Sequence, residues 1–84
     1  MTEKFEKAIE LVKKLKAVND EDKLILYSYY KQSQIGDINI EKPSILNRIE
    51  MEKWKAWSSV KGISKEEAMK NYVKKVKELL RNSL

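Results

Sequence analysis

Hydrophobic residues near the start of the chain recur at the spacing of one helical face. They are Phe5, Ala8, Ile9, Val12 and Leu15. Positions three and four apart lie on the same side of an α-helix, so this stripe predicts an amphipathic helix. Lysines and glutamates fill much of the remaining surface of the segment. The pattern therefore indicates a first helix that covers a core with one side only.

A second helix is predicted from about Asp20 to Ile35. The polar run 19–22 offers a side-chain oxygen for the helix start and negative charge for the positive end of the helix dipole. Gly36 can end this helix. From Gly36 to about Asn47, glycine, proline and short polar residues break any period, and this stretch is long for a connection in so small a domain. Such a loop is expected to cross the bundle.

The third and fourth helices follow the loop. The third is predicted near Ile49 to Lys61, with Gly62 as its stop. Ser64 followed three residues later by Glu67 forms a capping box, and an apolar stripe then continues over residues 68–80. No segment alternates as a half-buried strand. We therefore expect an all-α four-helix bundle that forms a single domain over residues 1–84.

Composition narrows the chemistry that this bundle can perform. The chain has 84 residues and contains no cysteine and no histidine. Catalytic Ser-His-Asp and Cys-His arrangements are therefore excluded, as is a histidine that acts as general acid or base. We expect no catalysis. A zinc site built from cysteine and histidine is excluded too, and no metal or cofactor is expected. No apolar run is long enough to span a bilayer, and the N-terminus lacks the apolar block of a signal peptide, which favours a soluble cytoplasmic protein.

The charge balance favours an anionic partner. Eighteen lysines and arginines against 13 acidic residues give a net charge of +5. This excess alone does not choose among nucleic acid, a membrane surface and a phosphorylated small molecule. Acidic and basic residues are interspersed, without the long basic blocks of a polybasic arm. A focused site fits the pattern better than a nonspecific one.

Aromatic and basic residues cluster within the second predicted helix. Tyr27, Tyr30 and Lys31 fall on one side of it, where a ring and an ammonium group could together hold something flat and anionic. In an arbitrary helical bundle the commoner explanation is core packing, with the lysine extending past the rings. The same explanation applies, by pattern alone, to Trp54 and Trp57 and to a tyrosine in the last stripe.

The order and spacing of several segments from Leu26 onward say more about function than any single residue does. The segments are Leu26–Gln32, Ile35–Asn39, Lys42–Pro43, Lys53–Trp57, Lys61–Gly62, Ser64–Met69 and Tyr72–Val73. Together they resemble the acyl-CoA-binding protein family over essentially the whole chain. The resemblance implies an up-down-down-up four-helix bundle, with a long overhand loop between the second and third helices. It also implies an intracellular carrier and pool former for long-chain fatty acyl-CoA esters in lipid metabolism.

The resemblance further implies a set of ligand contacts. The candidate acyl-CoA-binding residues are Lys13, Tyr27, Ser28, Tyr29, Tyr30, Lys31, Lys53 and Tyr72. Within this set, Tyr30 would stack on the adenine, while Tyr27, Lys31 and Lys53 would gather the 3′-phosphate of the coenzyme. Tyr72 would lie along the ligand near its acyl end, and Tyr29 is expected to be comparatively dispensable.

An apolar groove between helices is expected to take the acyl chain, with contributions from Ile9, Val12, Leu24 and Ile25.

The chain departs from the family pattern just before Lys53. A lysine that often contacts the ligand is replaced by Ile49, and Arg48, one position earlier, is a weak candidate for a substitute charge.

The alternative functions are those of a small basic helical module that binds nucleic acid or an anionic membrane surface. There is no evident recognition helix, and the first and last helices carry mixed charge. We therefore expect a protein that binds no nucleic acid and makes at most transient membrane contact. No leftover apolar stripe is evident apart from Leu11, so we also expect a monomer.

Overall fold

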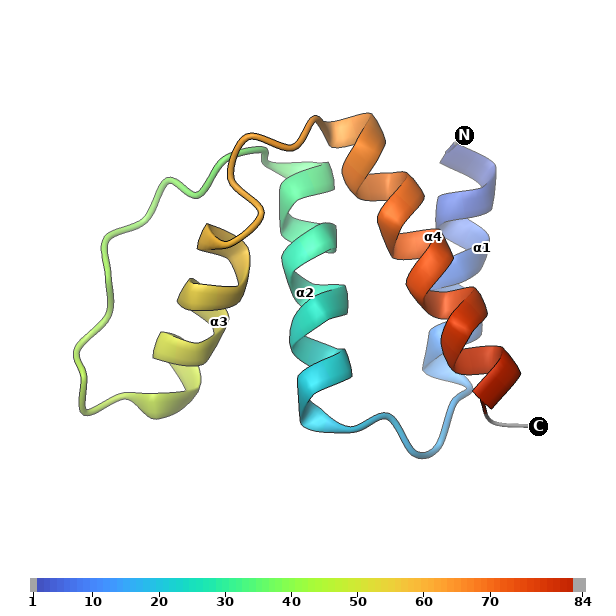
Figure 1. The fold of residues 1–84 in the computed structure, drawn as a ribbon, viewed down its shortest axis with the longest axis horizontal. Helices are drawn as coiled ribbons and strands as arrows, with labels where there is room; N and C mark the ends of the chain where they lie inside the picture. The colour runs from blue at the N-terminus through green and yellow to red at the C-terminus, as the bar shows by residue number, and fades with distance from the viewer. Residues whose placement is uncertain (1, 83–84) are drawn as a thin grey trace.

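The fold consists of four α-helices connected by loops and turns. The computed structural model describes residues 2–82, and within that range it contains no strand. The helices are α1 (Thr2–Lys13), α2 (Asp20–Gln34), α3 (Arg48–Ser58) and α4 (Lys65–Asn82). In Figure 1, α1 and α4 run in one direction, whereas α2 and α3 run in the other. This arrangement confirms the predicted up-down-down-up bundle with its long loop between α2 and α3.

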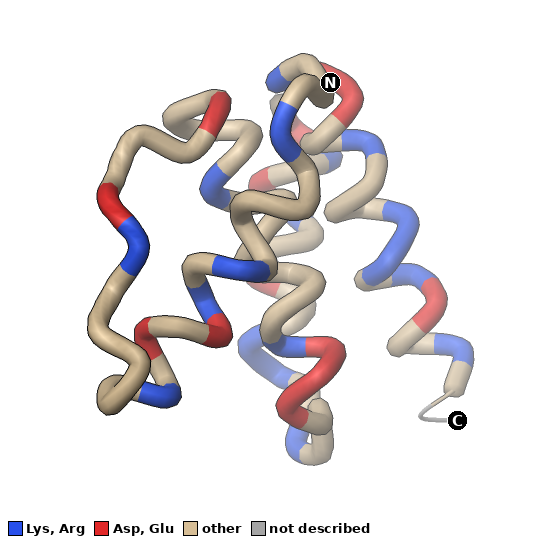
Figure 2. Tube along the Cα trace, turned by 60° about the vertical axis from the view of Figure 1, so that its left-hand side comes forward, with Lys and Arg blue, Asp and Glu red and all other residues tan. Residues whose placement is uncertain are grey.

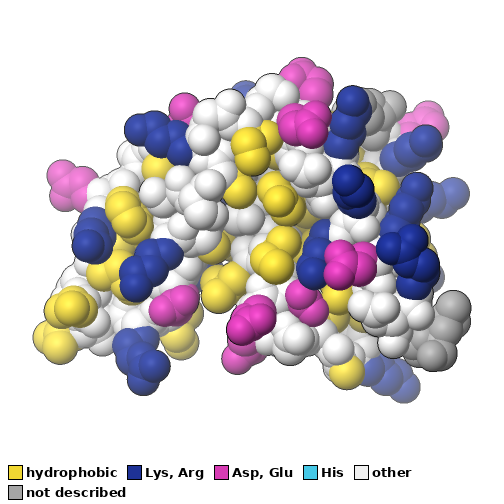
Figure 3. Space-filling model, viewed as in Figure 1, with side chains coloured by type: hydrophobic (Ala, Val, Ile, Leu, Met, Phe, Trp, Pro, Cys, Tyr) yellow, Lys and Arg dark blue, Asp and Glu magenta, His cyan; other side chains and the backbone are white. Residues whose placement is uncertain are grey.

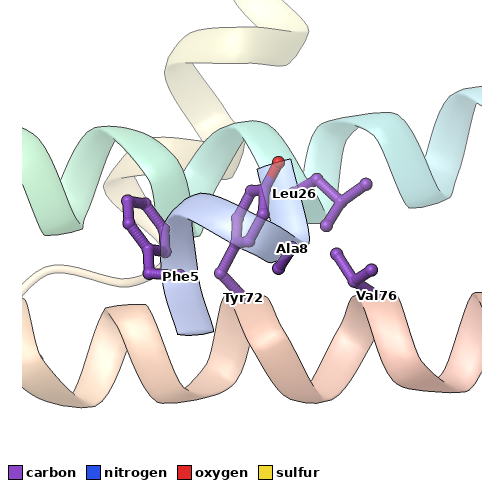
Figure 4. Packing of buried hydrophobic residues seen from close by; sticks show 5 residues of the cluster. All are labelled: Phe5, Ala8, Leu26, Tyr72 and Val76. Atoms are coloured by element: carbon purple, nitrogen blue, oxygen red, sulfur yellow. The ribbon is translucent and has the colours of Figure 1, made fainter. Parts of the chain in front are cut away.

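The core lies where α1, α2 and α4 meet. The helix α4 packs against both α1 and α2, and α2 packs on its other side against α3. The buried cluster consists of Phe5, Ala8, Leu26, Tyr72 and Val76 (Figure 4). Full burial of a side chain of valine to phenylalanine size contributes roughly 1.5–3 kcal/mol, so this small cluster supplies much of the stability.

Side-chain oxygens cap the N-termini of three helices. The Asp22 amide donates to Asn19 Oδ1 at 2.8 Å at the start of α2, as the sequence predicts. The Glu67 amide donates to Ser64 Oγ at 3.1 Å, which confirms the predicted cap of α4. At α3, Asn47 accepts a comparable bond from the following turn. Each of these bonds satisfies an amide that has no partner within its own helix.

The third helix is shorter than predicted, because it ends at Ser58 and not near Lys61. The Val60 and Lys61 amides bond three residues back, to Trp57 and Ser58, which tightens the chain into a turn. The Ser59 hydroxyl donates to the Ala56 carbonyl at 2.6 Å, and serine competes in this way with helix continuation. The turn then passes through Gly62, whose φ of +94° favours glycine.

Both tryptophans of α3 fasten the long loop to the bundle. Trp57 is 2% exposed, and its indole donates to the Gly36 carbonyl at 2.9 Å. Trp54 donates to the Ile40 carbonyl at 3.1 Å. Because two indoles of one helix bond successive parts of the loop, the loop has a defined path despite its length. Core and loop packing therefore account for both tryptophans.

Asp37 joins the loop to two other segments. Its carboxylate accepts the Gly62 amide and the Gln32 side-chain amide, each at 2.8 Å. The Gly62 amide, followed by Gln32, holds the pKa of Asp37 below its ordinary value of 3.8. Gln32, which is 1% exposed, also donates to the Ile63 carbonyl. This network fixes α2 and the long loop against the turn that leads into α4.

Candidate ligand-binding site

Two lysines share the ring of Tyr27 between α2 and α3. Tyr27 and Lys31 lie one turn apart on α2, and α3 packs beside them. The Lys31 ammonium lies 5.9 Å from the Tyr27 ring centroid, and the Lys53 ammonium lies 5.4 Å from it. Both distances are within the range of cation–π attraction. The structure thus brings together the three residues expected to gather a phosphate.

Lys53 is substantially exposed and weakly paired, whereas Lys31 is half-buried. Lys53 contacts Glu50 at 3.7 Å, and the two side chains are 40% and 51% exposed. Lys31 also lies 5.4 Å from the ring centroid of Trp57, which positions its long side chain across the junction of α2 and α3. The ammonium groups of Lys31 and Lys53 repel each other because both are positive. A doubly negative anion between them would be attracted to both and would offset this repulsion.

Tyr30 has different neighbours from Tyr27. Its ring lies 6.2 Å from that of Phe5, with an interplanar angle of 21°, and 6.4 Å from that of Tyr72. Tyr30 is nevertheless 41% exposed, so part of its ring is free to stack on a flat group. The sequence placed Tyr27 and Tyr30 on one side of the second helix. In the structure this side is broad, because Tyr27 faces α3 whereas Tyr30 contacts α1 and α4.

Tyr72 lies in the core beneath Tyr30. It is 5% exposed, and its ring meets Phe5 edge to face at 5.1 Å. Its hydroxyl points from α4 toward α2 (Figure 4). Burial, followed by the influence of Tyr30, raises the pKa of the Tyr72 hydroxyl above its ordinary value. The core position predicted from pattern alone is thus confirmed.

The three remaining candidates join neither the cluster around Tyr27 nor the ring contacts of Tyr30 and Tyr72. Ser28 is 4% exposed, and its hydroxyl donates to the Ile25 carbonyl at 2.7 Å, inside its own helix. Tyr29 packs against the core cluster. Lys13 ends α1 as an exposed side chain that pairs with Glu10 at 3.5 Å. A helical serine commonly bonds its own preceding turn, so the environment of Ser28 was the most predictable of the three.

Two largely apolar hollows lie next to α1, one beside its first half and one at its C-terminal end, where the connection to α2 begins. The first, of about 280 Å³, is lined by Thr2, Phe5, Glu6, Ile9, Tyr30, Gln34 and Met69. The second, of about 290 Å³, is lined by Val12, Leu15, Lys16, Val18, Lys23 and Leu26. Ile9 and Val12 therefore line hollows as expected. Leu24 and Ile25 line neither of them, whereas Leu26, which the sequence did not assign to the groove, lines the second.

Apolar side chains are exposed around the start of α3. Ile49 is 72% exposed, and Ile45 and Leu46 at the end of the long loop are 81% and 91% exposed. Arg48 is the first residue of α3 and is exposed to solvent. Among residues 2–82, no group of three histidine, cysteine, aspartate or glutamate side chains could hold a metal ion. No helix in that range is long and apolar enough to cross a bilayer.

The up-down-down-up bundle, with an aromatic and cationic surface next to apolar hollows, defines a small helical ligand-binding domain. The family described as acyl-CoA-binding protein matches residues 2–76. The chain belongs to the acyl-CoA-binding protein family.

Individual relatives agree with this assignment. An acyl-CoA-binding protein of Gossypium hirsutum is 48% identical over 80 residues, which cover 94% of this chain and 90% of that protein. Acyl-CoA-binding domain-containing protein 3 of Oryza sativa is 49% identical over 80 residues, but this chain spans only 52% of its length. The crystal structure of Oryza sativa acyl-CoA-binding protein 2 superposes with a TM-score of 0.93 at 44% identity. That superposition covers 98% of this chain and 92% of the other.

Proposed function

We propose that this protein binds long-chain fatty acyl-CoA esters and serves as their intracellular carrier and pool former, as a single domain over residues 1–84. The observation that carries the proposal is the pair of ammonium groups on the Tyr27 ring, next to the half-exposed ring of Tyr30. The names of the relatives support the same ligand. The protein would act in the cytoplasm as a monomer, by binding and release and without catalysis.

The head group would be held by charge and stacking together. Lys31 and Lys53 would bind the 3′-phosphate, with the Tyr27 hydroxyl as a further donor. Charge-assisted hydrogen bonds of this kind contribute about 1.5–3 kcal/mol each. The exposed part of Tyr30 would stack on the adenine, a contact worth about 1–3 kcal/mol per base. These contacts select a nucleotide with a phosphate at a defined position.

The acyl chain would occupy the hollows along α1. Burying a methylene contributes about 0.8 kcal/mol, so a chain with on the order of 14 methylenes offers roughly 11 kcal/mol as an upper value. Loss of translational freedom and incomplete burial reduce this amount. We infer that the chain supplies much of the affinity, whereas the nucleotide supplies selectivity.

The other candidate contacts would contribute unequally. Lys13 is exposed at the end of α1, and its ammonium would reach an anionic part of the ligand if released from its weak pair with Glu10. Tyr72 supports Tyr30 from below and would meet the ligand near its acyl end. Ser28 and Tyr29 would serve in packing and not in ligand contact, because Ser28 is buried and Tyr29 packs against the core cluster.

Calorimetric titration at physiological salt separates this function from the nucleic-acid alternative. Long-chain acyl-CoA and a double-stranded DNA fragment would be added in separate experiments. We expect saturable binding of one acyl-CoA per chain and no saturable heat with DNA. Binding of DNA without binding of acyl-CoA would replace the proposed function with the alternative.

A further inference from the structure

Basic side chains gather on the side of the bundle formed by α1 and α4. Within α4, they are spaced by four, three and four residues, which places them on one side of the helix. Figure 3 shows lysine and arginine side chains over this part of the surface, and the turned view of Figure 2 shows them recurring along α4. The basic face, as we call it, consists of Lys4, Lys7, Lys70, Lys74, Lys77 and Arg81.

A shallow apolar hollow lies in the middle of the basic face. It measures about 160 Å³ and lies at the seam of α1 and α4. Its lining residues are Lys4, Lys7, Ala8, Leu11, Val73, Val76, Lys77 and Leu80. Leu11 is 36% exposed, and three lysines belong to the same lining. The face therefore combines cations with a narrow strip of apolar surface.

Three acidic residues of the two helices have neighbours or partners outside the basic face. Glu6 lines the first hollow between α1 and α2. Glu10 pairs with Lys13. Glu78 pairs with Lys75, whose ammonium also reaches Asp22 of α2 at 2.8 Å. The remaining acidic residues, Glu3, Glu66 and Glu67, lie in the first turns of α1 and α4, where they complement the helix dipoles.

The basic face itself is left without internal charge partners. The ion pairs among residues 2–82 involve Lys13, Lys53 and Lys75, and none involves a member of the basic face. Along the sequence, α1 and α4 carry mixed charge and predict no membrane-binding helix. The fold joins lysines of both helices at one seam, an arrangement that neither helix shows alone.

We propose that the basic face adsorbs onto the surface of an anionic phospholipid bilayer. The lysine side chains would place their ammonium groups among the headgroup phosphates while their stems and Leu11 contact the interface. A lysine or arginine close to such a surface strengthens binding by about fivefold, and the attraction fades within a Debye length of about 10 Å. Several cations on one face thus act together.

The shape of the face favours a membrane over an acidic partner helix. A helix docked in a groove needs apolar pockets for side chains along several turns. The hollow of about 160 Å³ offers only a short strip of this kind. A bilayer needs no such pockets, because mobile anionic lipids can gather under fixed cations. The Tyr27, Lys31 and Lys53 cluster lies at the junction of α2 and α3, whereas the basic face lies at the seam of α1 and α4, so the head-group site would stay open on the membrane (Figure 1).

Sedimentation with vesicles tests the proposal in the absence of acyl-CoA, so its outcome is independent of the proposed ligand. The vesicles would contain phosphatidylcholine with or without about 30% phosphatidylserine, at roughly 0.1 M salt. The test variant is Lys4→Gln/Lys7→Gln/Lys77→Gln. The matched control, Lys42→Gln/Lys55→Gln/Lys65→Gln, removes the same charge from exposed positions elsewhere.

We expect the wild type and the control variant to bind the anionic vesicles, and neither to bind phosphatidylcholine alone. The test variant should bind on the order of a hundredfold more weakly, while its circular dichroism matches the wild type. Equal loss in both triple variants would show that net charge alone matters and would overturn the assignment to this face. Absence of wild-type binding to anionic vesicles would overturn it as well.

A third variant tests the main competing surface. Ile45→Ser/Leu46→Ser removes the most exposed apolar side chains, at the far end of the molecule from α1. We expect this variant to bind anionic vesicles as the wild type does. Loss of binding here, with full binding by the test variant, would assign membrane contact to the long loop and refute the proposal.

Discussion

Replacing Lys53 with methionine should weaken acyl-CoA binding without harming the fold. Methionine keeps the length and the apolar stem of the side chain but removes the ammonium group that lies 5.4 Å from the Tyr27 ring centroid. The one ion pair lost, to Glu50 at 3.7 Å, joins two substantially exposed side chains three residues apart. Such pairs contribute about 0.5 kcal/mol or less, so the unfolding free energy should hardly change.

The expected loss of binding is much larger than this change in stability. One charge-assisted bond to phosphate contributes about 1.5–3 kcal/mol, which corresponds to roughly a 10- to 150-fold rise in Kd. The whole of this loss should depend on the 3′-phosphate. A long-chain acyl-CoA that lacks the 3′-phosphate should therefore bind the wild type and Lys53→Met with similar, weakened affinity.

Isothermal titration of the wild type and Lys53→Met, each with the ligand that carries the 3′-phosphate and the ligand that lacks it, measures the interaction between Lys53 and this phosphate. Lys55→Met is the control, because Lys55 is an exposed lysine two positions along the same helix. It should leave all affinities near those of the wild type. If Lys53→Met lowered the affinity for the two ligands by the same factor, Lys53 would not contact the 3′-phosphate and the site assignment around Tyr27 would be wrong.

Three further predictions address the stacking ring, the loop and the polar network. Tyr30→Ala should weaken acyl-CoA binding by roughly 5- to 150-fold in calorimetry, because it removes the stacking ring, whereas Tyr29→Ala should mainly lower stability. Equal losses of binding by the two would contradict this division. Trp57→Phe leaves the Gly36 carbonyl without its donor and should cost about 1–3 kcal/mol in urea unfolding; an unchanged midpoint would argue against the indole fastening the loop. The pKa of Asp37 is lowered in the folded state, so its stabilising effect is present above the unfolded value and disappears as pH falls through the folded one, below 3.8. Asp37→Asn should therefore lose less stability than the wild type when thermal unfolding is followed from pH 5 to about pH 3, and parallel curves would contradict the role of this carboxylate.

The helices were largely predictable because their signals are local. The caps at Asn19 and Ser64 and the apolar stripe from Phe5 to Val12 are set by residues close in sequence, and the structure confirms them. Leu15, the last residue of the predicted stripe, lies beyond α1, which ends at Lys13. The end of α3 was less predictable. It depends on the turn after Ser58, where a serine hydroxyl and a positive-φ glycine act together.

The arrangement of the site depended on tertiary contacts that spacing does not reveal. Resemblance grouped Tyr27, Lys31 and Lys53, and the structure places them around one ring. Periodicity did not show that Tyr30 turns toward Phe5, because that contact depends on how α1 crosses α4. The meeting of lysines from α1 and α4 at one seam was hidden for the same reason, since each helix alone shows mixed charge.

The central claim is that one site binds the acyl chain and the nucleotide of the same ligand. Titration calorimetry with a long-chain acyl-CoA and with free coenzyme A tests it most directly. We predict saturable binding of one ester per chain, far tighter than binding of free coenzyme A, because burial of the chain in the hollows along α1 adds to the head-group contacts. Equal affinity for the two ligands would contradict the account.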